Sequence, residues 1–290
     1  MTKRVISVFL CVLCVISSIS FIVSAKENKE YTSDNFLSVA DGIIAWKKAD
    51  NGSEPDGYLI NDKYLENAGT TPGDWYPIAL GRLGIQDNNE GYLAVIKDRV
   101  EERYRESGRL SAAKATERHR IALAVLAMGG DPTNFGTDEN GAPINLIADG
   151  TYDRGKTTPL GRQGINGWIW GLITLDSMRY AVPDGAYNTR DDIIVEIISK
   201  QLSDGGFALS SDDADPDITA MAITALAPYY NSEKIYSYHR KALSADESKA
   251  VHEVVDEAVL CLSRLQLDTG DYKSWGTQNV ESTDWVAVAL

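Results

Sequence analysis

Five segments of the chain share one pattern, in which a polar or aromatic start precedes a run of mostly small and aliphatic residues. Such a run is apolar nearly all round a helix, which is typical of a helix buried on both sides. The starts lie about 44 to 66 residues apart, and this spacing predicts an array of helical units. The segments are DWYPIALGRLGI from Asp74, RHRIALAVLAMGG from Arg118, NGWIWGLITLDS from Asn166, DITAMAITALAPYY from Asp217 and TDWVAVAL from Thr283.

A second kind of helix alternates with these segments and is amphipathic. Each has an apolar stripe on one side and charged residues on the other, as expected for surface helices. Residues that commonly cap helices predict two of the starts, at Asn188 or Thr189 and at Ser244. The amphipathic segments are 34–47, 90–106, 188–202 and 247–265, and the stripe of the second is Leu93, Ile96, Val100 and Tyr104.

The alternation of buried and surface helices predicts an all-α protein with two concentric helical layers, that is, an α/α toroid. We expect little or no sheet, because no stretch shows sustained alternation of apolar and polar residues. Residues 26–290 are predicted to form one toroid domain. The sequence ends at Leu290 within an apolar helical run that has no cap, so we expect the toroid to be incomplete at its C-terminus.

The first 25 residues have the pattern of a secretory signal peptide. Lys3 and Arg4 precede an apolar stretch from Val5 to Val23, and Val23-Ser24-Ala25 fits a cleavage site. The alternative is an uncleaved membrane anchor, because the apolar stretch approaches the ~20 residues that span a bilayer. We expect cleavage, a secreted or surface location, and no membrane association after cleavage.

Charge and cysteine content narrow the classes of partner. The net charge is −14, and because the first 25 residues carry Lys3 and Arg4 and no acid, the rest carries −14 − 2 = −16. An acidic protein repels phosphate backbones, so nucleic acid is not an expected partner. Cys261 is the one cysteine after the signal, so no internal disulfide is expected, and its apolar helical surroundings predict burial.

The C-terminal third resembles a known repeat. QLSDGGF (Gln201–Phe207) with ADPDITAMAITAL (Ala214–Leu226) resembles the prenyltransferase and squalene-cyclase repeat, and LQLDTGDYKSWG (Leu265–Gly276) with ESTDWVAVAL looks like a weaker copy. The likeness is good over Ile193–Leu290 and loose over Tyr31–Leu290. It implies the α/α toroid shared by terpenoid cyclases, protein prenyltransferase β-subunits and cobalamin carriers. The motif points to the fold more than to an activity.

The likeness to class II terpenoid cyclases implies a proton donor in a D-x-D-D motif. The matching residues are Asp215, Pro216, Asp217 and Ile218, so the middle acid is present and the last one is replaced. A cyclase acid must stay protonated through burial and hydrogen bonds, and the lost carboxyl weakens that case. We favour the interpretation that Asp217 caps its helix, and keep a cyclase that uses Asp217, with Asp215 beside it, as an alternative.

Other chemistries have less support. Prenyl transfer would need zinc on Asp, Cys and His, and no Asp-x-Cys pair accompanies Cys261, so no metal site is predicted. Polysaccharide cleavage by paired carboxylates would use Asp74, Asp217 and Asp284 at the starts of inner helices, but no spacing distinguishes an acid from a base. The acidic loop Ser210–Asp217 lacks the spacing of known calcium loops, so it supports Ca²⁺ only weakly.

Aromatic residues near the helix starts favour a ligand-binding protein. A rim of tryptophans with carboxylates nearby suits a sugar, a corrinoid-like ring or an extended peptide. Packing between layers is the alternative for each tryptophan taken singly, and a structural surface module within a longer protein is the alternative for the whole chain. The predicted ligand-binding residues are Asp74, Trp75, His119, Asn166, Trp168, Trp170, Asp217, Trp275, Asp284 and Trp285.

Overall fold

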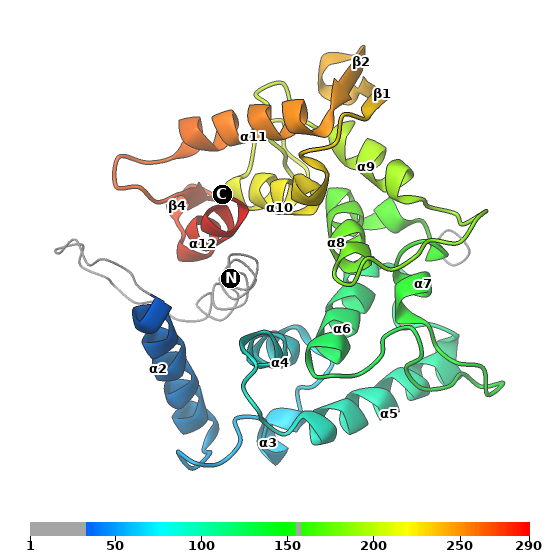
Figure 1. Cartoon of the computed structure of the whole chain (residues 1–290), viewed down its shortest axis with the longest axis vertical. Coiled ribbons are helices and arrows are strands. Elements are labelled where there is room, and N and C mark those ends of the chain that lie inside the picture. The colour runs from blue at the N-terminus through cyan, green and yellow to red at the C-terminus, as the bar shows by residue number, and fades with distance from the viewer. Residues whose placement is uncertain (1–32, 155–157) are drawn as a thin grey trace.

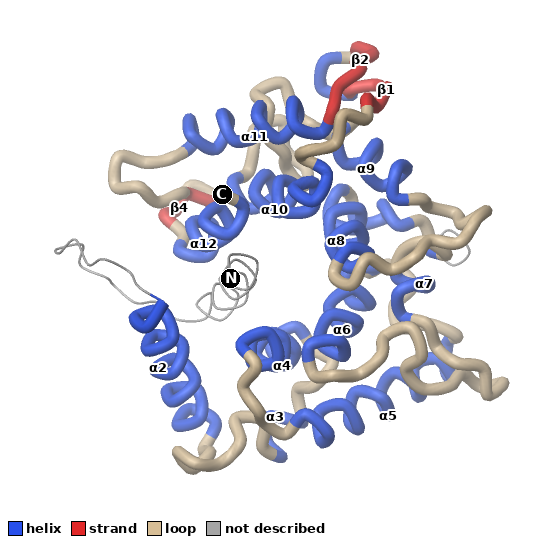
Figure 2. The backbone as a smooth tube through the Cα atoms, in the orientation of Figure 1, coloured by secondary structure: helices blue, strands red, loops and turns tan. Residues whose placement is uncertain are grey.

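The computed structural model describes residues 33–154 and 158–290, and this part of the chain is mostly helical (Figure 1, Figure 2). The predicted signal peptide lies outside the described residues. The helices are α2 (Ser33–Asn51), α3 (Asp62–Leu65), α4 (Thr71–Leu83), α5 (Asn89–Ser107), α6 (Ala115–Ala127), α7 (Leu146–Gly150), α8 (Ile165–Asp176), α9 (Arg190–Ile198), α10 (Pro216–Leu226), α11 (Val251–Leu265) and α12 (Val280–Ala289), with short 3₁₀ turns at Leu160–Gln163, Ala227–Tyr229 and Lys241–Leu243.

Five helices form an inner row along an open arc. In Figure 1 these are α4, α6, α8, α10 and α12, and each packs against the next one in the row. Each of the five apolar segments of the sequence starts within one of these helices and ends one to four residues beyond it. Their contact surfaces are made of aliphatic and small residues, such as Leu80, Ala122, Ile169 and Ala220, which are at most 1% exposed. The described protein is therefore all-α in class.

The amphipathic helices lie outside this row. In Figure 1, α5, α9 and α11, which lie in three of the predicted amphipathic segments, flank the convex side of the arc together with the short helix α7. On α5, Ile96, Val100 and Tyr104 of the predicted stripe are buried, and Leu93 is partly buried against the core. Thr189 caps α9 in a capping box, so this predicted start is confirmed.

A β-hairpin precedes α11 in a stretch where the sequence predicted no strand. Strands β1 (Ile235–Arg240) and β2 (Ala245–Ala250) pair antiparallel, so the expected helix from Glu247 begins instead at Val251. Ser244 does not cap that helix, because it lies in the tight turn between the strands with a φ of 49°. The prediction of little or no sheet overlooked a short alternation in IYSYHR, where every second side chain is buried. A second hairpin, β3 (Lys273–Ser274) with β4 (Thr277–Gln278), precedes α12.

The chain turns tightly after α9, in the segment Gln201–Phe207. The Gln201 side chain donates to the Gly205 carbonyl at 2.8 Å, and the Leu202 N–H donates to the Gly206 carbonyl at 2.8 Å. Gly205 has a φ of 89°, and a Cβ there would lie 2.7 Å from the Glu257 carbonyl oxygen. Only glycine meets both conditions without strain.

The turn after α11, in the segment Gln266–Tyr272, is built in the same way. The Gln266 side chain donates to the Gly270 carbonyl at 2.8 Å, and the Leu267 N–H donates to the Asp271 carbonyl at 2.9 Å. Gly270 also has a φ of 89°. The two segments share Gln, Leu and Gly at these positions and reverse the chain through the same bonds.

Each turn is tied to the helix that follows it. The Asp215 N–H donates to the Phe207 carbonyl at 2.9 Å, and the Asn279 N–H donates to the Tyr272 carbonyl at 3.0 Å. These bonds close the connecting loops at their base and set where α10 and α12 begin. A threonine in the first turn of each helix adds a second bond. The Thr219 hydroxyl of α10 accepts from the Phe207 N–H at 2.9 Å, and the Thr283 hydroxyl of α12 accepts from the Tyr272 N–H at 3.1 Å.

Candidate functional site

Three tryptophans from three inner helices meet in one cluster. Trp75 of α4 and Trp170 of α8 have ring centroids 5.8 Å apart at an interplanar angle of 56°. Trp170 and Trp285 of α12 are also 5.8 Å apart, at 82°. These distances are typical of favourable aromatic pairs. All three side chains are only partly buried, so they pack on the core and also keep exposed surface. We call Trp75, Trp170 and Trp285 the tryptophan cluster.

Asp74, next to Trp75, is bonded on both carboxylate oxygens to other parts of the protein. The carboxylate is fully buried and receives the guanidinium of Arg120 at 2.7 Å, the hydroxyl of Tyr92 at 2.7 Å and the N–H of Gly69 at 2.6 Å. Burial raises the pKa of Asp74, and the bonds from Arg120 and Tyr92 act in the opposite direction. With both oxygens bonded and no exposed surface, Asp74 links α4 to α5 and α6 and leaves no acceptor for a ligand.

Asp215, rather than Asp217, caps α10. Its Oδ1 accepts from the Ile218 N–H at 3.1 Å, its Oδ2 accepts from the Ser274 hydroxyl at 3.0 Å, and Pro216 occupies the first helical position. The interpretation that Asp217 is the cap is therefore wrong. A proline at the first helical position normally follows the cap, and this rule would have identified Asp215 from the sequence.

Asp217 is half-buried, and one of its carboxylate oxygens has no hydrogen-bond partner among the described residues. Burial raises its pKa, Ser282 of α12 opposes that shift, and the charges of Asp215 and Glu281 add to it. A carboxyl in these surroundings is easier to protonate than a free one.

Asp284 of α12 has the least compensated charge of the candidate acids. Burial, followed by repulsion from Glu281, raises its pKa to about 7. Its Oδ2 is buried without a partner among the described residues. Glu281 therefore acts on both Asp217 and Asp284. The sequence interpretation missed Glu281, although it stands in the first turn of α12 as Asp217 stands in the first turn of α10.

The remaining candidates lie in different surroundings. Asn166, in the first turn of α8, has a buried side-chain oxygen with no partner among the described residues. Trp168 lies beneath the ammonium of Lys200, 5.8 Å from the ring centroid. Trp275 is 93% exposed at the tip of the β3–β4 hairpin and is not part of the tryptophan cluster.

His119 is 1% exposed and does not reach the surface. One ring nitrogen, Nε2, lies 2.7 Å from the Gly150 carbonyl, which requires the N–H tautomer at that atom. Burial lowers its pKa to about 3, so the ring is neutral near neutral pH. His119 therefore links α6 to the end of α7 in its neutral form.

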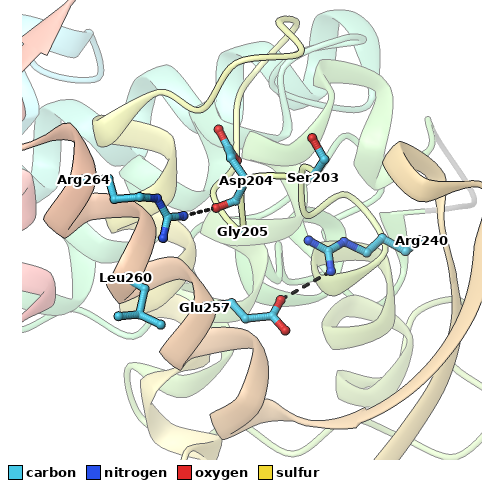
Figure 3. Close-up of a pocket in the computed structure, with 7 residues that line it drawn as sticks. All are labelled: Ser203, Asp204, Gly205, Arg240, Glu257, Leu260 and Arg264. Atoms are coloured by element: carbon cyan, nitrogen blue, oxygen red, sulfur yellow. Dashed lines mark hydrogen bonds and ion pairs between the residues drawn. The ribbon is translucent and has the colours of Figure 1, made fainter.

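A pocket of about 210 Å³ lies beside the turn that follows α9 (Figure 3). Arg240 is buried there, donates to the carbonyls of Gln201 and Leu202, and forms an ion pair with Glu257 at 3.3 Å. Arg264 donates to the carbonyl of Asp204. These cations hold the turn in place, which gives the pocket a structural explanation. Its lining consists of Ser203, Asp204, Gly205, Arg240, Glu257, Leu260 and Arg264.

No group of three or more His, Cys, Asp or Glu side chains within residues 33–154 and 158–290 is arranged to hold a metal ion. The acidic loop Ser210–Asp217 thus does not bring three such side chains together. Cys261 is buried and free, as predicted. In the same two ranges, no helix combines the length and the apolar character that crossing a bilayer needs.

Comparison with known proteins gave no relatives for this chain. No family model, no curated protein and no solved structure matches it.

Proposed function

We propose that the protein is an exported, non-catalytic α/α toroid of the prenyltransferase and squalene-cyclase repeat type that binds a ligand on its inner helices. Two observations support the toroid: the inner row of helices with a second set outside it, and the identical bonding of the two turns after outer helices. The basic and apolar N-terminal segment supports export.

The chemistry of the inner helices favours a ligand with hydroxyl groups and apolar ring faces, such as a short glycan. Tryptophan rings pack well against the C–H faces of sugars, while the sugar hydroxyls donate to nearby acceptors. Three inner-helix side chains, Asn166, Asp217 and Asp284, each have a buried oxygen that lacks a donor among the described residues. Because an unpaired buried acceptor costs about 1–3 kcal/mol, a ligand that supplies donors gains that free energy on binding.

The tryptophan cluster is the observation that carries this proposal, and tryptophan fluorescence tests it directly. Titration with a panel of soluble oligosaccharides should change the emission of the wild type and release heat in calorimetry. Trp170→Phe and Trp285→Phe, which keep an aromatic ring, should weaken binding about tenfold or more, a loss of roughly 1.4 kcal/mol. Trp275→Phe, at the exposed hairpin tip, is the matched control and should bind like the wild type.

The proposal fails if no oligosaccharide binds to the folded protein, or if both cluster variants bind as tightly as the control. A corrinoid and an extended peptide would then be screened in the same assay. If one of them binds, and the cluster variants weaken that binding, it replaces the oligosaccharide as the ligand.

A second candidate function, acid catalysis, is favoured by the raised pKa values of Asp217 and Asp284. A carboxyl whose pKa is raised is better suited than a free one to protonate a polyprene or a glycosidic oxygen. Asp217→Asn should abolish cyclisation of a squalene-type substrate, and Asp284→Asn should abolish glycoside cleavage. Wild-type protein that consumes neither substrate would exclude this candidate and leave the binding proposal intact.

A further inference from the structure

A second pocket, of about 300 Å³, lies between α5, α6 and the loop that leads into α4. It shares no residue with the tryptophan cluster or with the acids of α10 and α12. Its floor is aliphatic, and the side chains that form it are each at most 4% exposed. They are Ala68, Ile96, Val100, Leu110 and Ile121.

Two arginines of α5, one helical turn apart, line the rim of this pocket. Arg103 forms an ion pair with Glu117 at 3.2 Å. Arg99 donates through its two terminal nitrogens to the carbonyls of Ala68, Leu65 and Glu66, the last two at 3.4 and 3.0 Å. Among the described residues no carboxylate forms an ion pair with Arg99, so its charge faces only backbone dipoles.

An uncompensated guanidinium above an aliphatic floor fits one kind of ligand. We propose that this pocket binds a single-chain carboxylate, with the alkyl chain on the floor and the carboxylate on Arg99. The guanidinium also carries an N–H at Nε that takes part in none of these bonds and can donate a charge-assisted hydrogen bond to a carboxylate oxygen. The volume equals that of about ten waters at ~30 Å³ each, which suits one short alkyl chain. Glu102, also on the rim, is solvent-exposed, and there its repulsion is screened.

The test is calorimetric titration of the full chain with octanoate, 1-octanol and octylammonium. These probes share a chain and differ in headgroup charge. Octanoate should bind, and the other two should bind at least tenfold more weakly. Arg99→Gln should weaken octanoate binding about 10- to 100-fold, as expected for the loss of a charge-assisted bond. Arg105→Gln is the matched control, because Arg105 is an exposed arginine of the same helix outside the pocket lining.

A second variant tests the floor. Val100→Phe fills the aliphatic space and should abolish binding of octanoate while circular dichroism confirms the helical fold. If that variant does not fold, the Arg99 and Arg105 pair decides the matter. The proposal is overturned if folded wild type does not bind octanoate, if octanol binds equally well, or if Arg99→Gln and Arg105→Gln behave alike. Oligosaccharide binding at the tryptophan cluster should be unchanged in Arg99→Gln, so the two proposals fail separately.

Discussion

Two inner helices carry the same dipeptide, Asp-Trp, and the two aspartates have opposite surroundings. Asp74 of α4 has a guanidinium, a phenol and a backbone N–H on its two oxygens. Asp284 of α12 has an unpaired buried oxygen and a neighbouring negative charge from Glu281. The tryptophans that follow them both belong to the tryptophan cluster, so the difference lies in the acids alone.

The difference shows that the charge next to a buried carboxylate decides whether it stabilises the fold or is available to a proton or a ligand. Arg120 lies 46 residues from Asp74 and reaches it because α4 packs against α6. A charge compensated in this way stabilises the fold and is unavailable for chemistry. A carboxylate without such a partner holds a proton more readily and can accept a donor from a ligand. At the α4–α6 end the buried acid is therefore structural, and at the α10–α12 end the acids are the candidate functional ones.

The largest expected effect comes from breaking the Asp74–Arg120 pair. Asp74→Asn leaves the partly buried guanidinium of Arg120 uncompensated and should lower the free energy of unfolding by about 3 kcal/mol, measured by urea denaturation. Asp98→Asn, on the exposed side of α5, is the control and should change stability by less than about 0.5 kcal/mol. Similar losses in the two variants would mean that the Asp74 network is not structural.

The second effect is a dependence of the unfolding free energy on pH. It comes from His119 of α6, at the α4–α6 end. The folded pKa of about 3 lies below the unfolded value of ~6.5, so the unfolded state gains a proton first as the pH falls. The contribution is complete above pH ~6.5 and is lost below it, by about 2 kcal/mol at pH ~5. His119→Gln should remove this slope from urea-denaturation curves collected across the pH range.

His239→Gln serves as the control for that experiment, because His239 is exposed on β1. It should keep the wild-type slope below pH ~6.5. If the His119 variant also keeps that slope, the buried imidazole is not its cause.

At the α10–α12 end, Asp284 should give a pH effect of the opposite sign. Its folded pKa of about 7 lies above the unfolded ~3.9, so the folded state holds the proton between these values, and stability falls as the pH rises through them. The change in unfolding free energy caused by Asp284→Asn should therefore depend on pH. It should be more favourable at pH ~8.5 than at pH ~4 by about 1–3 kcal/mol, a range that allows for the partial exposure of Asp284. An equal effect of the mutation at both pH values would remove the contrast with Asp74.

The smallest effect concerns the exposed tryptophan of the α10–α12 end. Trp275 has a φ of 55° and Gly276 a φ of 80°, so a residue with a Cβ occupies the left-handed region in a two-residue hairpin turn. Asn-Gly is the preferred pair in such a turn, and Trp275→Asn should raise the melting temperature, with a gain of about 0.5–1 kcal/mol. A loss of stability would instead indicate that the Trp275 side chain makes stabilising contacts.

The sequence predicted the inner helices well because their composition is distinctive. A run such as ITAMAITAL is apolar on every side, and burial on both faces explains it. The β1–β2 hairpin was missed because its alternation covers only six residues. A longer strand would have given a clearer signal.

The candidate site was only partly predictable. The tryptophans and acids near the helix starts were identified as a group, but their roles depend on contacts between segments far apart in sequence. Nothing in the local sequence separates Asp74 from Asp284, because Arg120 and Glu281 act through the packing of helices. The capping role of Asp215 was available from the sequence, because Pro216 follows it.

The hydrogen bonds that close the loops at Phe207–Asp215 and Tyr272–Asn279 have a practical consequence for protein engineering. The first stretch is one residue longer than the second, and yet both deliver the chain to a capped helix start in the same way. Since the ends are pinned at the base, residues between them can be added at a small entropic cost, about 0.6 kcal/mol for each doubling of length. The exposed stretch 209–213 is thus a natural point for inserting an epitope, a reporter peptide or the new termini of a circular permutant.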